Sequence, residues 1–476
     1  MGLTFGTSGI RGLETELTDL ACSRLARAFI RHFKSLSSDS SPHQCIIGGD
    51  LRRSTPRILA AVAQGLSQEG ITVLNAGILP TPALANECLI RKTPGIMITG
   101  SHIPADRNGI KFYFPWGEVL KKDEAPILEH DRLLGLEEAA NGAITPKAAQ
   151  ISRSIPAQET YVNRYTQLFP KDALKGLTLC LYEHSTAARD ALGAVLEGLG
   201  AQVIRFGRTD EFLPVDTEAL DQVAHLAAQL HQAKGFALVS ADGDGDRPLL
   251  LDESGAVVRG DQLGILAALA LEADFVATPV STSTSLEKTQ AFPDIQRTRI
   301  GSPFVIEAME EAKKRGFRRI VGFEANGGFL VGSDLTLGNG TLGQLPTRDC
   351  MLPVLLVLIQ AARAGQSVSK LVSQLPPRFT ASRLIRNFPP EASGSVLERL
   401  QAEEMSLLAR RWKDQLGTLQ AIQRVDGVRV EFSSGDILHF RPSGNAPEFR
   451  IYTESHDSPR AEELGDEAQA WISSLR

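Results

Sequence analysis

The chain has 476 residues, of which 42% are hydrophobic and 22% charged, and its net charge is −6. This composition is ordinary for a globular protein of about three or four domains, and the acidic balance argues against nucleic acid as a partner. The five cysteines are widely spaced, so we expect reduced thiols in a cytoplasmic protein rather than a disulfide framework or a zinc site. We also expect no signal peptide and no membrane partner, because the apolar run 351–362 is too short to span a bilayer.

In chain order, the first notable segment is glycine-rich, Phe5-Gly-Thr-Ser-Gly-Ile-Arg-Gly12. Its glycines would let backbone N–H groups approach an anion closely, and Arg11 adds a cation. A simple turn at the start of the chain explains the segment as well. The segment Gly48–Ser54 then ends a predicted strand and opens a helix, so Asp50 or Ser54 can serve simply as the helix cap.

A unit of helix, glycine and strand recurs along the chain. Predicted helices over 59–66 and 187–196 are each followed by a glycine and a strand, and 313–323 is a looser copy. The recurrence predicts several α/β domains of related build. Chance similarity is the alternative, since glycine is common after a helix.

A predicted strand over 95–99 leads into a loop that contains Ser101 and His102. Asn108-Gly109 predicts a turn, and the returning strand 110–114 would bring Lys111 back beside Ser101. A hydroxyl with a nearby amine has the parts of an activated nucleophile or phosphate acceptor, although Ser101 can equally be a loop hydroxyl. Because adjacent side chains of an extended chain point to opposite sides, we expect Ser101 and His102 not to pair directly, and His102 could instead donate to a phosphate.

The segment Asp242-Gly-Asp-Gly-Asp-Arg247 places three carboxylates at alternate positions. Such hard oxygen ligands suit Mg²⁺ or Ca²⁺, and Arg247 would suit a phosphate beside the metal. An EF-hand loop is one alternative, with Glu253 in the twelfth place, but Arg247 stands where that loop needs glycine and the flanking residues resemble strands. A solvated acidic turn without a ligand is the other alternative.

Glu324 and Asn326 stand two apart in a loop that follows the predicted strand 319–323. A carboxylate and an amide together suit the hydroxyls of a sugar, although a tight turn explains the loop about as well. The last hundred residues predict a small antiparallel α+β domain. Its strands and closing helix are expected at 428–432, 437–440, 449–452 and 460–475.

The loop Arg441-Pro-Ser-Gly-Asn-Ala-Pro447 joins two of these strands and is followed by Arg450. Two arginines, a serine, an asparagine and exposed backbone N–H groups would make a phosphate cradle. A solvated charged hairpin is the alternative interpretation.

Five of these segments together resemble the α-D-phosphohexomutase superfamily of phosphoglucomutases and phosphomannomutases. They are Gly6-Thr-Ser-Gly-Ile-Arg-Gly12, Thr99-Gly-Ser-His-Ile-Pro104, Asp242-Gly-Asp-Gly-Asp-Arg247, Glu324-Ala-Asn-Gly327 and Arg441-Pro-Ser-Gly444, in the family's order. The resemblance implies an α/β fold of four domains around a central cleft, three of them related α/β domains and the last an α+β domain. The expected domains are 1–153 with the phosphoserine loop, 154–255 with the metal loop, 256–374 with the sugar loop and 375–476 with the phosphate-binding loop.

The resemblance also implies a role for each site residue. Ser101 would be a phosphoserine that, with Asp242, Asp244 and Asp246, binds Mg²⁺. The residues beside the transferring phosphoryl group would be Arg11 and Arg247, with Lys111 and His102 assisting proton transfer and orientation. The substrate-binding residues would be Gly301, Glu324 and Asn326 for the sugar, and Arg441, Ser443, Asn445 and Arg450 for the phosphate that does not react.

The sugar loop Glu324-Ala-Asn-Gly-Gly328 is most similar to that of a bacterial branch of phosphomannomutases. This similarity implies an enzyme that interconverts mannose 1-phosphate and mannose 6-phosphate through a hexose 1,6-bisphosphate. We expect a monomer or small homo-oligomer. A phosphoglucomutase or a mutase of dual specificity is the main alternative, and a phosphoglucosamine mutase fits less well because its usual loop reads Gln-Ser-Gly-His. A metal-dependent phosphatase and a non-catalytic sugar-phosphate binder are alternatives of other classes.

The chain departs from the commoner family pattern at a few positions. They are Gly100 for alanine, Ile103 for asparagine, Asn326 and Gly328 for serine and histidine, and Asn445 and Ala446 for threonine and an acidic residue. None of these changes removes the expected nucleophile or a metal ligand, so they bear on the choice of sugar.

Overall fold

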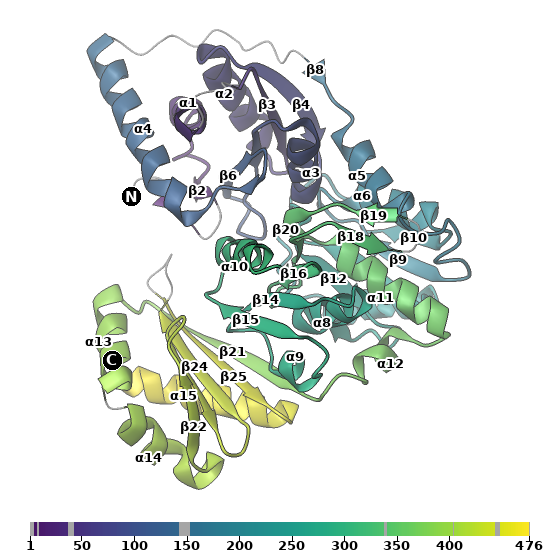
Figure 1. Cartoon of the computed structure of the whole chain (residues 1–476), viewed down its shortest axis with the longest axis vertical. Coiled ribbons are helices and arrows are strands. Elements are labelled where there is room, and N and C mark those ends of the chain that lie inside the picture. Colours follow the sequence, from purple (N-terminus) through teal and green to yellow (C-terminus); the bar gives the residue numbers. More distant parts are fainter. Residues whose placement is uncertain are drawn as a thin grey trace.

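The computed structural model describes residues 4–6, 9–36, 42–141, 153–337, 340–402, 404–442 and 448–475. Four large sheets with their helices form four units, which follow one another along the chain (Figure 1). The α/β fold with four units is therefore confirmed. The domain boundaries given above stay a prediction.

The first unit is built on an eight-stranded sheet. Its strands lie in the order β1 (Thr4–Phe5), β2 (Ile10–Leu13), β6 (Arg107–Phe114), β5 (Gly95–Ile98), β3 (Gln44–Gly49), β4 (Thr72–Ile78) and β8 (Arg153–Ser154), with β7 (Gly117–Glu118) paired to β6. The helices of this unit are α1 (Asp19–Leu36), α2 (Thr55–Gln68), α3 (Thr81–Arg91) and α4 (Lys121–Asn141). Helix α1 packs against α2 and α4.

The second and third units have five-stranded sheets. The second sheet has the order β10 (Gln202–Phe206), β9 (Thr178–Tyr182), β11 (Ala237–Ala241), β12 (Pro248–Leu251) and β13 (Val257–Val258). The third has the order β15 (Asp294–Thr298), β14 (Phe275–Pro279), β16 (Ile320–Phe323), β17 (Phe329–Val331) and β20 (Leu345–Asp349), with a hairpin of β18 (Leu335–Leu337) and β19 (Gly340–Leu342) nearby. The helices are α5 (Ala157–Thr166), α6 (Arg189–Gly198), α7 (Val223–Gln232), α8 (Gly260–Ala270), α9 (Ser285–Lys288), α10 (Ser302–Lys314), α11 (Met351–Ala364) and α12 (Val368–Val372).

The first three sheets share one topology, which confirms the predicted repeat. In each sheet one strand (β3, β9 or β14) has a parallel neighbour on both sides. The neighbour later in the chain (β5, β11 or β16) also pairs with the antiparallel strand that directly follows it. The loop before that antiparallel strand is β5–β6, β11–β12 or β16–β17. These loops carry Ser101, the aspartates 242–246 and Glu324, respectively. Three of the predicted motifs thus occupy equivalent positions in a repeated unit.

The fourth unit is antiparallel, as predicted, and has its own core. Its sheet has the order β21 (Phe379–Arg386), β25 (Glu448–Ser455), β24 (Ile437–Pro442), β23 (Val428–Phe432) and β22 (Leu419–Gln423), covered by α13 (Pro390–Ala402), α14 (Glu404–Leu416) and α15 (Ser458–Ser474). In its core the rings of Trp412 and Trp471 lie edge to face, with their centres 4.8 Å apart. Among the described residues, this core is made of side chains of the fourth unit alone. One other core joins the first three sheets, with Ile46, Leu179 and Phe323 as members.

The predicted turn at Asn108-Gly109 is wrong. Asn108 and Gly109 do not form a turn but lie inside β6, where they pair with Gly12 and Arg11 of β2. Glycine is needed at 109 because a Cβ there would come within 2.7 Å of two backbone oxygens, those of Ile10 and Thr99. The Asn-Gly signal therefore reflects close strand packing, and the chain reverses earlier, between β5 and β6.

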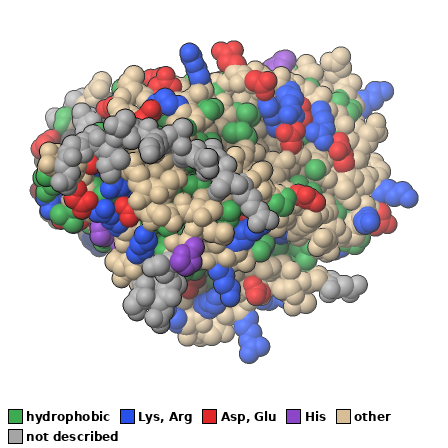
Figure 2. All heavy atoms as spheres, turned by 90° about the horizontal axis from the view of Figure 1, so that it is seen from above, with side chains coloured by type: hydrophobic (Ala, Val, Ile, Leu, Met, Phe, Trp, Pro, Cys, Tyr) green, Lys and Arg blue, Asp and Glu red, His purple; other side chains and the backbone are tan. Residues whose placement is uncertain are grey.

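The surface and the helices agree with the balanced composition. On the face shown in Figure 2, basic and acidic side chains are interspersed rather than gathered into one patch. Within the described ranges, no helix is both long and apolar enough to cross a membrane. The apolar run 351–362 forms most of the buried helix α11.

Candidate active site

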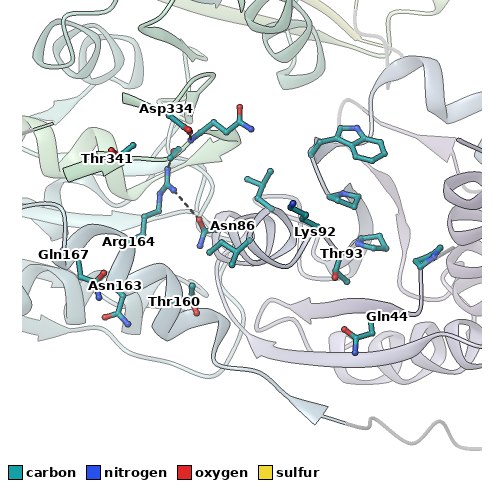
Figure 3. Close-up of a pocket in the computed structure, with 18 of the residues that line it drawn as sticks. Gln44, Asn86, Lys92, Thr93, Thr160, Asn163, Arg164, Gln167, Asp334 and Thr341 are labelled. Carbon is teal, nitrogen blue, oxygen red and sulfur yellow. Dashed lines mark hydrogen bonds between the residues drawn. The ribbon is translucent and has the colours of Figure 1, made fainter. Parts of the chain in front are cut away.

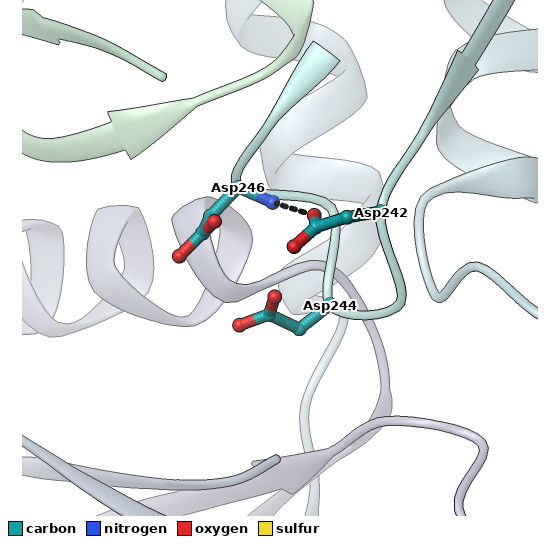
Figure 4. Close-up of side chains that lie close together, drawn as sticks. All are labelled: Asp242, Asp244 and Asp246. Carbon is teal, nitrogen blue, oxygen red and sulfur yellow. Dashed lines mark hydrogen bonds between the residues drawn. The ribbon is translucent and has the colours of Figure 1, made fainter. Parts of the chain in front are cut away.

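The three equivalent loops meet at the aspartates of the β11–β12 loop. Asp242, Asp244 and Asp246 are buried, and one carboxylate oxygen from each lies within 4.8 Å of the others (Figure 4). The loop turns back on itself because Asp242 Oδ1 accepts hydrogen bonds from the backbone N–H groups of Asp246 and Arg247, both at 3.1 Å. Gly245 adopts φ 67°, and a Cβ there would strike Ala188. The flanking strands β11 and β12 are antiparallel, which excludes an EF-hand.

The donor set fits a divalent cation. Asp244 Oδ1 and Asp246 Oδ1 are buried and accept no hydrogen bond from the described residues, and such orphaned oxygens are costly unless something charged pairs with them. Burial and the neighbouring aspartates raise the pKa of Asp242 well above its usual range. The pKa of Asp246 is lowered, because Arg348 and Lys111 outweigh the effect of burial. The orphaned oxygens of Asp244 and Asp246 and the nearby carboxylate of Asp242 thus form the oxygen donor set that a hard metal ion takes.

Ser101 lies directly against this triad. Its Oγ donates a 2.7 Å hydrogen bond to Asp242 Oδ2, and its backbone has φ 56°, in the left-handed region. His102 Nδ1 lies 3.4 Å from the same Oγ. The expectation that Ser101 and His102 cannot pair is therefore wrong, because the chain is not extended at Ser101. Burial, followed by the charges of Arg247 and Arg11, lowers the pKa of His102 to about 2, so its ring is neutral.

Lys111 returns beside the Ser101 loop, opposite Met97 in the β5–β6 register. Its Nζ donates to Asp244 Oδ2 at 2.6 Å and to Asp246 Oδ2 at 2.9 Å. The amine thus binds the carboxylates of the second unit and ties the two loops together. Thr81, at the start of α3, adds a 2.7 Å hydrogen bond to Asp244 Oδ2.

Two arginines border the triad. Arg247 Nε lies 3.8 Å from Asp246 Oδ1 and 4.0 Å from Asp242 Oδ2. Arg11 comes from β2 of the first unit, and burial with the charges of Arg247 and Arg348 lowers its pKa to about 10. Its guanidinium therefore stays charged at neutral pH, and its buried Nε has no hydrogen-bond partner in the described chain. Both arginines have free donor capacity for an anion.

Arg348 connects the aspartate loop to the loop that carries Glu324, a role that no sequence motif indicated. Its guanidinium donates to Asp246 Oδ2 at 2.7 and 3.1 Å and to Glu324 Oε2 at 2.8 Å. It lies at the end of β20, outside every motif recognised in the sequence. Asn326 Oδ1 accepts from the backbone N–H of Gly328 at 2.9 Å, so this side chain also holds its own turn.

Gly301 and Arg441 lie where the third and fourth units touch. Gly301, with φ 133°, precedes α10, and the N–H of the adjacent Ile300 donates to Asp426 Oδ2 at 3.0 Å. Arg441 Nε forms an ion pair with the same oxygen at 2.9 Å. Arg450 stands opposite Arg441 in the β24–β25 register. Ser443 and Asn445 lie outside the described residues.

A large groove lies elsewhere, among α3, α5 and the β18–β19 hairpin (Figure 3). It has a volume of about 1490 Å³, and Asn86, Lys92, Arg164 and Trp116 are among its lining residues. Arg164 Nη1 donates to Asn86 Oδ1 across it at 3.3 Å. None of its described lining residues belongs to the site around the aspartates.

Solved structures share this architecture. The crystal structure of a putative phosphomannomutase from Thermus thermophilus matches with a TM-score of 0.75 over 99% of both chains, at 21% sequence identity. The fold is therefore that of the phosphohexomutases. In sequence, residues 2–131 match phosphoglucomutase/phosphomannomutase alpha/beta/alpha domain I, and residues 259–379 match domain III.

Curated relatives extend the match over nearly the whole chain. A phosphomannomutase of Sinorhizobium fredii is 42% identical over 98% of this chain and 97% of its own length. A phosphomannomutase of Salmonella muenchen is 40% identical over 95% of this chain and 92% of its own. The chain belongs to the phosphoglucomutase/phosphomannomutase family.

Proposed function

We propose that the chain is a phosphomannomutase, an isomerase that interconverts mannose 1-phosphate and mannose 6-phosphate. The relatives that are 40–42% identical over nearly the full chain carry that name. The observation that carries the proposal is the contact between Ser101 Oγ and Asp242 Oδ2 at 2.7 Å, inside a carboxylate triad that fits a divalent cation. This contact joins the Ser101 hydroxyl of the first unit to the aspartate loop of the second, which supports Ser101 as the nucleophile beside a metal ion.

In this proposal Ser101 carries the phosphoryl group. The P–Oγ bond breaks as a P–O bond to the free hydroxyl of the hexose phosphate forms, and the hydroxyl proton ends on Oγ. The product is a hexose 1,6-bisphosphate, which turns around and returns its other phosphate to Ser101. Phosphoryl transfer of this kind needs positioning and fixed cations more than covalent chemistry, and Arg11 and Arg247 border the triad where these cations are needed.

The other site residues receive roles from their positions. Asp242, Asp244 and Asp246 would hold Mg²⁺, which when bound spreads the negative charge of the phosphoryl oxygens. Lys111 would carry the proton, and the neutral His102 would orient Oγ. Glu324 and Asn326, with Gly301, would contact the sugar. The distal phosphate would lie on the cradle formed by Arg441, Ser443, Asn445 and Arg450.

A mutase assay with the proposed substrate tests this function. Mannose 1-phosphate, Mg²⁺ and a trace of hexose 1,6-bisphosphate are supplied, and mannose 6-phosphate and free phosphate are followed. Net release of free phosphate would support a phosphatase instead, and no turnover of any hexose phosphate would support a non-catalytic binder. Comparing kcat/KM for mannose, glucose and glucosamine phosphates separates the phosphomannomutase from a phosphoglucomutase, a dual-specificity enzyme and a phosphoglucosamine mutase.

We also infer a cytoplasmic location, because all five cysteines are buried free thiols, as in proteins of reducing compartments. The expectation of a monomer or small homo-oligomer stays a prediction.

A further inference from the structure

A single buried arginine holds the backbone of the Ser101 loop. Arg52, between β3 and α2, donates from Nη2 to the carbonyl oxygens of Ser101 and Ile103 at 2.8 and 2.6 Å. Its Nη1 donates to those of Pro104 and Arg107 at 2.7 and 2.8 Å. Three carbonyls of the loop and the first carbonyl of β6 thus converge on one guanidinium, a pattern that its planar fork of donors allows and a lysine amine does not.

The same arginine is anchored on its other side. Its Nε forms a fully buried ion pair with Asp50 Oδ2 at 3.3 Å. That oxygen also accepts from Thr99 Oγ1 at 2.7 Å, and Thr99 Oγ1 in turn accepts from the backbone N–H of Ser101 at 2.8 Å. Both the N–H and the C=O of Ser101 therefore lead back to the Asp50–Arg52 pair. Because Ser101 has φ 56°, a conformation that serine rarely adopts, these bonds are what holds it there.

The face of the Arg52 guanidinium is covered from the second unit. Its Cζ lies 4.0 Å from the centre of the Phe212 ring, and Phe212, in the segment between β10 and α7, is only 8% exposed. The same ring touches the metal loop, because a Cβ on Gly243 would come within 2.8 Å of its Cζ and within 2.7 Å of the Ser101 carbonyl oxygen. Phe212 is thus packed between the arginine that holds Ser101 and the loop that holds the aspartates.

We propose that Arg52 and Phe212 form a clamp that sets the position of Ser101 relative to Asp242 during phosphoryl transfer. Both are positioning residues: neither contacts the reacting atoms, and each acts through the Ser101 loop. The proposal rests on the proposed function, since it assumes that Ser101 carries the phosphoryl group. A clamp of this kind affects the chemical step more than substrate affinity, because the sugar and the distal phosphate would bind to other units.

The clamp is tested with two variants of the full-length enzyme. Phe212→Leu removes the aromatic face but keeps an apolar side chain, and Arg52→Lys keeps the charge but loses the fork of donors. In the mutase assay we expect kcat to fall about tenfold in the first and about a hundredfold in the second, with KM within about twofold of wild type, as small misplacements of a reacting group produce. The rate at which hexose 1,6-bisphosphate phosphorylates Ser101, followed by intact mass, should fall in parallel.

The chain offers a matched control for each variant. Phe317→Leu removes the face of another arginine–aromatic pair, in which the Cζ of Arg315 lies 4.9 Å from the Phe317 ring centre. Arg297→Lys changes another arginine that holds loop carbonyls, those of Pro279, Thr282 and Ser283, although its side chain is 12% exposed. Both controls should keep the wild-type kcat, because neither pair touches the Ser101 loop.

The outcomes separate the clamp from the proposed function. A wild-type enzyme without mutase activity would overturn the proposed function and the clamp with it. If the wild type is active and the kcat of Phe212→Leu stays within twofold of it, the clamp alone is overturned. The same holds if the loss in Phe212→Leu appears in KM alone. If Arg52→Lys fails to fold, the kcat of Phe212→Leu still tests the clamp, and its thermal unfolding curve shows whether that variant is folded.

Discussion

Replacing Arg348 with methionine should lower the free energy of unfolding, because two buried carboxylates lose a partner. Arg348 has 4% of its side chain exposed and pairs with Asp246 and Glu324, whose side chains are 1% and 5% exposed. Removing one partner of a buried ion pair costs about 3–5 kcal/mol, because the other charge stays buried. Asp246 keeps Lys111 as a partner, so we expect a loss at the lower end, about 3 kcal/mol of the free energy of unfolding.

Urea-induced unfolding with EDTA and with Mg²⁺ measures this effect. Mg²⁺ should recover part of the loss, because the cation pairs with Asp246 but leaves Glu324 alone. Arg383→Met is the control: Arg383 makes comparable bonds of 2.6 and 2.7 Å to Asp466 and Glu462, but those partners are exposed. Exposed pairs contribute about 1 kcal/mol or less. Equal losses of stability in the two variants, or an Arg348 variant that Mg²⁺ stabilises no more than wild type, would contradict this expectation.

Three further variants address the nucleophile, the cradle and the pH dependence. Ser101→Ala should lower kcat about a thousandfold or more, as loss of a nucleophile does, while calorimetry still detects hexose-phosphate binding; retained turnover would remove the phosphoserine role. Arg441→Met should raise KM about tenfold or more, since a hydrogen bond to a charged group contributes about 1.5–3 kcal/mol; an unchanged KM would exclude Arg441 from the cradle. His439 is buried, which lowers its pKa to about 4 from 6.5. As pH falls, His439 therefore binds a proton in the unfolded chain before it does so in the folded one. The stability that neutral His439 contributes is complete above pH 6.5, and roughly 3 kcal/mol of it is lost as pH falls to about 4. Urea unfolding of His439→Gln should show a weaker pH dependence in that window, and an unaltered slope would contradict this.

The sequence predicted the motif loops because each lies next to a strand with a clear pattern. The runs before Asp242 and after Arg247 are apolar and become β11 and β12, and Val428–Phe432 alternates and becomes β23. Local pattern was enough in these places, because the strand and the loop are neighbours in the chain.

What the sequence could not predict depends on contacts between distant segments. Arg348 and Phe212 meet the site only because the units pack together, and neither belongs to a recognisable motif. The Ser101–His102 contact required the left-handed backbone at Ser101, which distant bonds from Arg52 and Thr99 impose. Asn108-Gly109 carries the composition of a turn, but its pairing with β2 decided the conformation.

The separate core of the fourth unit determines how that unit is joined to the rest. The other three share a continuous apolar interior, whereas the fourth meets the third through polar bonds, including those that Glu454 and Asp426 accept from Thr284 and Ile300. Exchanging such a bond for water costs about 1 kcal/mol, far less than dividing an apolar interior. A change in the angle between the third and fourth units therefore costs little free energy, because it exchanges polar bonds for water and leaves both apolar cores intact.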